Sequence, residues 1–145
     1  KDLLRIFEQE GDMILDWYYE YFVETTKTID YAIDSVTESL VDGSSATQTD
    51  VTLARVGEFP MPLEVQVTGL DGQQWTFYIP LRLMRGEKSP DADQEQGWMA
   101  QDDWPWVEPT YTFTVPVPIS EIATITIDES GLLADVDRSN NSWEP

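Results

Sequence analysis

The chain contains no cysteine and no histidine among its 145 residues. Without cysteine, neither disulfides nor thiolate metal sites can form. Without histidine, the chain lacks the commonest metal ligand, the Ser-His-Asp triad and the His-Glu-x-x-His zinc helix. We therefore expect no catalytic residue, no cofactor and no tight zinc site within this chain.

Positive charge and long apolar runs are also scarce. Lysine and arginine together number 8 against 28 acidic residues, which gives a net charge of −20. This acidity argues against nucleic acid and anionic membranes as partners. No apolar run reaches the roughly 18 residues that a membrane span needs. Because the chain starts at Lys1 rather than methionine, we expect an excised piece whose own targeting signal is missing.

The clearest structural signal is a β-hairpin at residues 59–84. Its two arms alternate apolar with more polar residues, the pattern of strands with one buried face. A three-residue loop, Leu70-Asp71-Gly72, places Val67 opposite Trp75 and puts both apolar sets on one face, with Gly72 left-handed. A two-residue Asp71-Gly72 loop would place the two sets on opposite faces. We therefore predict the three-residue loop. The apolar sets are Met61, Leu63, Val65 and Val67, and Trp75, Phe77, Ile79, Leu81 and Leu83.

The remaining pattern indicates a mainly β protein. Residues 2–24 predict two short helices, broken at Gly11, with Asp12 as the cap of the second. Short strands with turn signals between them predict an immunoglobulin-like two-sheet β-sandwich preceded by these helices. We expect a helical segment at 1–26 and a sandwich domain at 27–145 with a long acidic, Trp-rich loop at 85–109. Besides the hairpin, the expected strands are 28–36, 48–56, 111–117 (at an edge or interrupted), 122–128 and 132–136.

Two groups of aromatic residues are candidate interfaces. The second helix is apolar on more than one side, so it either packs wholly against the sandwich or presents part of its surface to a neighbouring domain. For the three tryptophans of the acidic loop there are two interpretations. We favour the one in which they plug the open end of the sandwich or fill a domain contact. In the other, they form a platform that binds sugar or peptide. The candidates are Trp17, Tyr18, Tyr21 and Phe22 in the helix, and Trp98, Trp104 and Trp106 in the loop.

One stretch has the oxygen spacing of a calcium loop. Asp135, Asp137, Ser139 and Asn141 occupy positions 1, 3, 5 and 7, but the sixth position is Asn140 rather than glycine and the twelfth is not glutamate. An Asx-rich turn is therefore the favoured interpretation, and calcium is the alternative. The acidic loop, with Asp91, Asp93 and Glu95 among its carboxylates, is a further calcium candidate that we interpret as solvated surface.

Several stretches resemble a known family. LDWYYEYFVETTKTIDYAI (15–33) resembles the end of the catalytic helical domain of bacterial aminopeptidase N-like zinc metallopeptidases of the gluzincin type. FPMPLEVQV, FYIPLRLMRGEK, WPWVEPTYTF and ADVDRSNN resemble the β-sandwich at the C-terminal end of a secreted bacterial branch of that family. Taken together these stretches are specific to the family, whereas each stretch alone is a weak signal. They cover the chain from about Leu15 to Asn141.

The resemblance implies a non-catalytic C-terminal accessory domain of a zinc aminopeptidase, a hydrolase located in the periplasm or secreted. None of the family's catalytic motifs matches here, so zinc is implied for the parent's upstream catalytic domain alone. The partner would be that domain, which this chain braces. Weak self-association of the excised piece is a separate expectation, because the second helix is apolar on more than one side. The alternative is a stand-alone β-sandwich binding module for carbohydrate or a protein partner.

Overall fold

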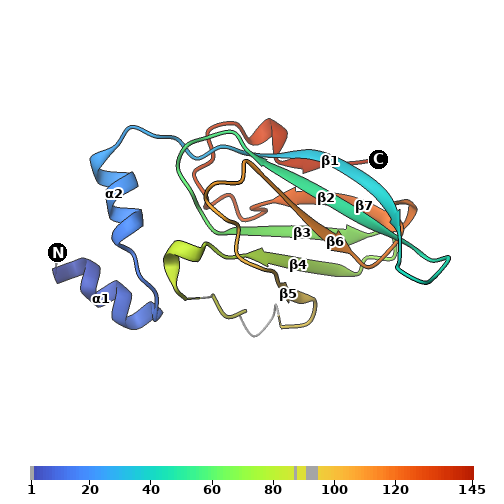
Figure 1. The fold of residues 1–145 in the computed structure, drawn as a ribbon, viewed down its shortest axis with the longest axis horizontal. Coiled ribbons are helices and arrows are strands. Elements are labelled where there is room, and N and C mark those ends of the chain that lie inside the picture. The colour runs from blue at the N-terminus through green and yellow to red at the C-terminus, as the bar shows by residue number, and fades with distance from the viewer. Residues whose placement is uncertain (1, 87, 91–94) are drawn as a thin grey trace.

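The computed structural model describes residues 2–86, 88–90 and 95–145. In the described residues, two helices are followed by eight strands. Figure 1 shows both helices to one side of the strands. The helices are α1 (Asp2–Gly11) and α2 (Asp16–Glu24); the strands are β1 (Tyr31–Leu40), β2 (Thr47–Arg55), β3 (Leu63–Gly69), β4 (Gln74–Ile79), β5 (Trp98–Ala100), β6 (Thr110–Val115), β7 (Ile122–Ile127) and β8 (Ser142–Trp143). Short 3-10 turns are η1 (Arg82–Met84), η2 (Ile119–Glu121) and η3 (Arg138–Asn140).

The strands form two sheets that pack face to face. One sheet has the order β1-β2-β6, and the other has the order β5-β4-β3-β7-β8, with β5 the only parallel neighbour among the described strands. Along the described strands the chain crosses between the sheets three times, after β2, after β5 and after β6. This connectivity, with β4 beside β3 in the sheet that holds β7 and β8, is that of an immunoglobulin-like sandwich. The predicted fold class is therefore confirmed. The core lies between the sheets and includes Val51, Leu53, Val65, Val67, Phe77, Phe113, Ile125 and Ile127.

The hairpin of β3 and β4 has the predicted register. Val67 pairs with Trp75, Val65 with Phe77 and Leu63 with Ile79. The Gly69 N–H donates to the Gln73 carbonyl at 2.8 Å, which closes the three-residue loop. Gly72 has φ +83°, the left-handed value expected of the glycine that ends this loop type.

Two strands near the C-terminus differ from the prediction. No strand forms at 132–136, because Ala134 is left-handed with φ 60° and Leu132, at 86% exposed, faces solvent. The last described strand is instead β8, near the C-terminal end, where Trp143 pairs with Ile125. A two-residue strand carries no alternation, so the sequence gives no signal for it. The loop at 85–109 likewise contains an unpredicted strand, β5, which pairs with β4.

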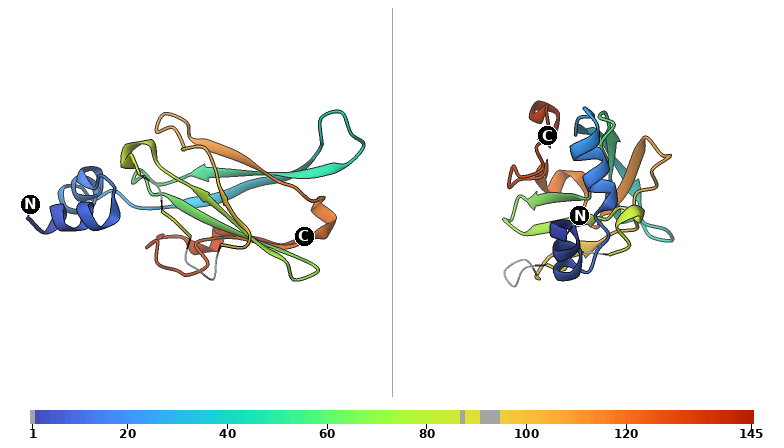
Figure 2. Two further views of the ribbon diagram at one scale, coloured as in Figure 1. Left: turned by 90° about the horizontal axis from the view of Figure 1, so that it is seen from below. Right: turned by 90° about the vertical axis from the view of Figure 1, so that its left-hand side faces the viewer.

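The predicted cap of the second helix is also wrong. Asp12 takes φ 46° in the turn between the helices, and α2 begins after Leu15 without a side-chain cap. The Leu15 N–H instead donates to Glu8 Oε1 of α1 at 2.9 Å. The two helices are therefore linked to each other, and together they stand at one end of the sandwich (Figure 2). No helix in the described part of the chain is long and apolar enough to cross a membrane.

Candidate functional site

The candidate interface begins with helix α2, which turns its aromatic side chains toward the sandwich. Trp17 is 8% exposed, and its Nε1 donates to the Ile14 carbonyl at 2.7 Å. Tyr18 and Tyr21 are partly buried against the same core. Phe22 stacks on Tyr18 with ring centroids 5.4 Å apart, but it remains 61% exposed. The helix thus has one side committed to the sandwich and another side facing solvent.

The contact on the sandwich side is made by Phe59, from the connection between β2 and β3. Its ring is 2% exposed and lies 5.4 Å from Tyr21 and 6.0 Å from Tyr18. Trp106 covers Tyr21 from another side at 5.8 Å. We call this set the aromatic junction: Trp17, Tyr18, Tyr21, Phe22, Phe59 and Trp106. Aromatic pairs of this geometry contribute about 0.5–1.5 kcal/mol each beyond the area they bury.

Two basic side chains lie over rings of the aromatic junction. The Arg55 guanidinium lies 4.2 Å from the centre of the Trp106 ring, and its Nη2 donates to the Trp106 carbonyl at 2.7 Å. Lys27 stands 4.8 Å above the Tyr21 ring. Two of the chain's eight basic residues are therefore used to fix aromatic rings where the helices meet the sandwich. Arg55 is the last residue of β2, and Phe59 follows Gly57 and Glu58. Neither position carries a sequence pattern that would have predicted its part in this contact.

The three loop tryptophans lie in three different environments. Trp104 is buried, its Nε1 donates to the Glu108 carbonyl at 2.8 Å, and its ring packs between Tyr31 and Tyr111. Trp104 is thus part of the buried core. Trp106 belongs to the aromatic junction. Trp98 lies on β5 and stacks on Tyr78 at 5.3 Å, so the three rings do not form one platform.

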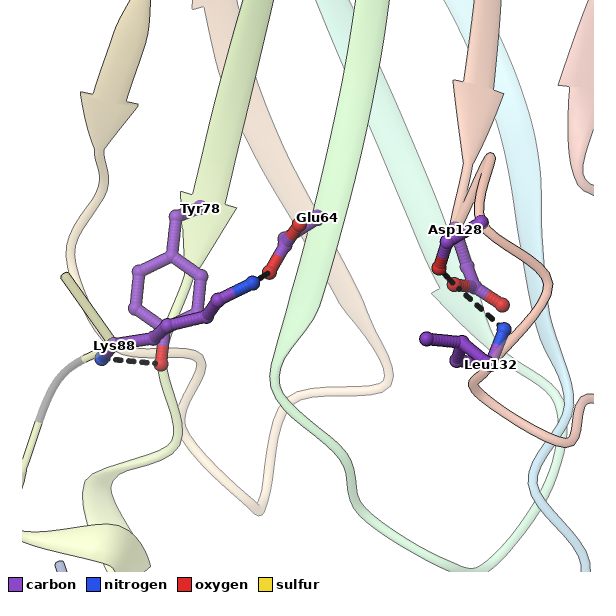
Figure 3. Close-up of polar contacts among 6 residues, drawn as sticks. Glu64, Tyr78, Lys88, Asp128 and Leu132 are labelled. Carbon is purple, nitrogen blue, oxygen red and sulfur yellow. Dashed lines mark hydrogen bonds and ion pairs between the residues drawn. The ribbon is translucent and has the colours of Figure 1, made fainter. Parts of the chain in front are cut away.

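Around Tyr78, polar contacts cover the outer face of the five-stranded sheet (Figure 3). The Lys88 backbone N–H donates to Tyr78 Oη at 3.2 Å, and Lys88 Nζ lies 2.6 Å from Glu64 Oε1. Tyr78 is consequently buried although its side chain points away from the sandwich core. On the same view, Asp128 Oδ1 accepts from the Leu132 N–H at 3.3 Å. These contacts fix loops onto the sheet.

Burial perturbs two tyrosines near Trp104. Loss of hydration raises the pKa of Tyr31 to about 12, and its hydroxyl accepts from the Met61 N–H at 2.9 Å. Partial burial, followed by the charges of Asp102 and Asp103, raises the pKa of Tyr111 to about 12. Both phenols are therefore neutral in the folded protein up to strongly alkaline pH.

The residues with calcium-loop spacing form consecutive Asx turns. Asp135 Oδ2 accepts from the Tyr31 N–H at 3.0 Å, and its Oδ1 accepts from the Asp137 N–H at 2.9 Å. Asp137 Oδ1 accepts from both the N–H and the hydroxyl of Ser139, and these bonds lower the pKa of Asp137. Asn141 is buried. The Asp135 carboxylate thus ties the chain after β7 to the start of β1.

The described residues contain no group of three or more Asp or Glu side chains placed to hold a metal ion. Of the acidic loop, Asp91 and Asp93 lie outside the described residues. Glu95 and Asp102 are described, and the Asp102 carbonyl accepts from the Tyr111 hydroxyl at 2.7 Å.

Both helices expose large apolar side chains to solvent. We call this set the helical apolar face; its exposed members are Leu3, Ile6 and Phe7 of α1 and Tyr19, Phe22 and Val23 of α2. Positions 3, 6 and 7 recur at helical spacing, so they line one side of α1. Where exposed apolar side chains join into a larger patch, they usually mark a contact with another protein surface.

Comparison with known proteins adds no relative. No protein-family model matches the chain, and neither the curated proteins nor the solved structures contain a match.

Proposed function

We propose that this chain is the non-catalytic C-terminal accessory domain of a zinc-dependent aminopeptidase-like metallopeptidase, and that it braces the catalytic domain. The observation that carries the proposal is the helical apolar face, whose residues are exposed although Trp17, Tyr18 and Tyr21 of the same helical segment pack against the sandwich core. A second domain that covers this face would remove from water the side chains of Leu3, Ile6, Phe7, Tyr19, Phe22 and Val23. The resemblance to bacterial aminopeptidase N-like enzymes supports the idea that the domain covering these side chains is the catalytic domain.

The aromatic junction explains how the chain would brace its neighbour. Tyr18 and Tyr21 pack on Phe59, whose own ring is buried in the sandwich. Helix α2 is thereby held by rings that have few rotamers, and α1 is linked to α2 through the bond from the Leu15 N–H to Glu8. A domain that binds the helical apolar face is thus fixed in orientation relative to the two sheets.

On this proposal the chain itself does no chemistry. Peptide hydrolysis would use zinc and ligands in the upstream domain, located in the periplasm or outside the cell as in the family resembled. The purified chain is expected to show no aminoacyl hydrolysis and no tight zinc binding, since carboxylates alone seldom hold zinc. Stoichiometric zinc after dialysis, together with measurable turnover, would contradict the proposal.

The direct test is the open reading frame that encodes this chain. We expect a His-Glu-x-x-His stretch upstream of Lys1. An upstream region without any zinc-ligand motif would instead favour the stand-alone binding module.

A biochemical test uses the upstream region expressed as a separate protein. Binding of the chain to it, measured by calorimetry, is expected to be at least tenfold weaker for Phe22→Glu than for the unchanged chain. The matched control is Leu132→Glu, which places the same charge at an equally apolar position that is 86% exposed on the sandwich. Equal loss of binding in both variants would show that added charge, rather than the helical apolar face, decides the affinity.

A further inference from the structure

The four open sheet edges of the described structure differ in how they are protected. β5 has three residues and β8 has two, and short edge strands resist pairing with other chains. The edge strand β1 has a register break between Ile33 and Ser35 and carries the exposed charges of Asp34 and Glu38. The edge strand β6 is six residues long, pairs with β2 without a register break and contains no charged residue. β6 therefore lacks the usual protection, apart from prolines before and after it.

The pairing with β2 shows which backbone groups of β6 face outward. The Arg55 N–H donates to the Pro109 carbonyl at 2.9 Å, and these residues continue the pairing of Leu53 with Tyr111. Hydrogen-bonded pairs alternate along an antiparallel ladder, so Tyr111, Phe113 and Val115 bond to β2. The N–H and C=O groups of the three threonines between them face the open edge. These residues, Thr110, Thr112 and Thr114, are all exposed.

We propose that β6 pairs antiparallel with β6 of a second copy of this chain, about a two-fold axis at Thr112. In this register Thr112 lies opposite the partner's Thr112, and Thr110 lies opposite the partner's Thr114. Each pair is threonine against threonine, a favourable cross-strand combination, and the pairing brings no like charges directly opposite each other. The contact is the same patch on both copies, as a two-fold axis requires. The product is a continuous sheet with the order β1-β2-β6-β6-β2-β1.

Charge and area determine the conditions under which the pairing is observed. Each copy carries a net charge of −20, so two copies repel each other, and salt screens that repulsion. A single strand pair buries less than the about 1,600 Å² of a standard stable interface. The association is therefore weak at low salt and strengthens as salt and protein concentration rise. This surface lies on the sandwich, and the inference does not depend on the proposed function.

The test uses disulfide trapping, because the chain has no cysteine of its own. Opposite residues of a hydrogen-bonded antiparallel pair have Cα atoms about 5.5 Å apart, within the range of about 4.4–6.8 Å that a disulfide spans. Oxidation of Thr112→Cys in high salt is expected to give a covalent dimer. The matched control is Thr52→Cys, which lies beside Thr112 on the same sheet face, with hydroxyls 2.9 Å apart, but on the inner strand β2. It is expected to remain largely monomeric.

Sedimentation equilibrium provides a second readout without a thiol. Thr112→Lys is expected to weaken the salt-dependent association at least tenfold, while Thr52→Lys, with the same change in net charge, leaves it within about twofold. Monomeric behaviour of the unchanged chain at every salt concentration would overturn the proposal, as would equal trapping of the two cysteine variants. Association that survives Thr112→Lys but disappears in Phe22→Glu would also overturn it, because the helical apolar face would then carry the contact.

Discussion

The sandwich and the helical segment use their apolar residues in opposite ways. Val51, Val65 and Ile125 of the sandwich are fully buried between paired strands. In the described part of the two helices, by contrast, only Trp17 is buried. Helices of ten and nine residues are shorter than the about 12–15 residues at which isolated helices become even marginally stable. Most of the buried core thus lies in the sandwich, whereas the helices leave apolar side chains exposed that, on the proposed function, a second domain would cover.

The largest expected effect contrasts two phenylalanines. Phe77→Ala is expected to cost about 3–5 kcal/mol in the free energy of unfolding, because the buried ring packs 4.6 Å from Phe113 between the sheets. Phe22→Ala is expected to cost less than about 1 kcal/mol, because that ring is mostly exposed. Urea denaturation of both variants measures the difference. Similar losses would mean that the helices belong to the same cooperative core as the sheets.

The next effect is a loss of sandwich stability at alkaline pH. Tyr31 has an ordinary pKa of 10.0 when unfolded and about 12 when folded, so folding favours the neutral phenol. This contribution is complete below pH 10, falls as the unfolded state ionises, and levels off above about pH 12. The loss is on the order of 2–3 kcal/mol for a shift of this size.

Denaturation at several pH values between 9 and about 12 would show it, and Tyr31→Phe should reduce the pH slope by about one proton. An unchanged slope in that variant would show that other groups cause the loss. Tyr111, whose pKa is also raised to about 12, lies in the sandwich as well.

A smaller effect tests the hairpin loop. Gly72→Ala is expected to cost about 1 kcal/mol, because an L side chain is strained in the left-handed region. An added Cβ meets no atom within 4 Å, so the cost is conformational rather than steric. Thermal denaturation with calorimetry measures it. An unchanged melting temperature would contradict the left-handed conformation assigned to this residue.

The sequence predicted the parts of the fold that have a strong periodic pattern. The hairpin register followed from matching the apolar sets of β3 and β4, since only the three-residue loop buries both on one face. The short strands β5 and β8 were not predictable, because two or three residues carry no alternation and their pairing depends on distant segments. The predicted strand at 132–136 failed because its apolar residues belong to a turn closed by Asp128, whose Oδ2 accepts from the Leu133 N–H.

The candidate site was predictable in part for the same reason. The helical spacing of Trp17, Tyr18 and Tyr21 marked one aromatic surface, and the structure packs it onto the sandwich. Phe59 and Arg55, which complete the aromatic junction, lie outside any periodic pattern near the helices. Their roles arise from tertiary contacts between segments more than 30 residues apart.

Hydrogen exchange of the helices tests the central claim most directly. Backbone amides of α1 and of the β3–β4 hairpin would be compared in this chain and in the longer protein that the proposed function implies. In this chain alone, α1 is expected to exchange at least 100-fold faster than the hairpin, and in the longer protein it should approach the hairpin's protection. Protection of α1 equal to that of the hairpin in this chain alone, or no added protection in the longer protein, would contradict the account.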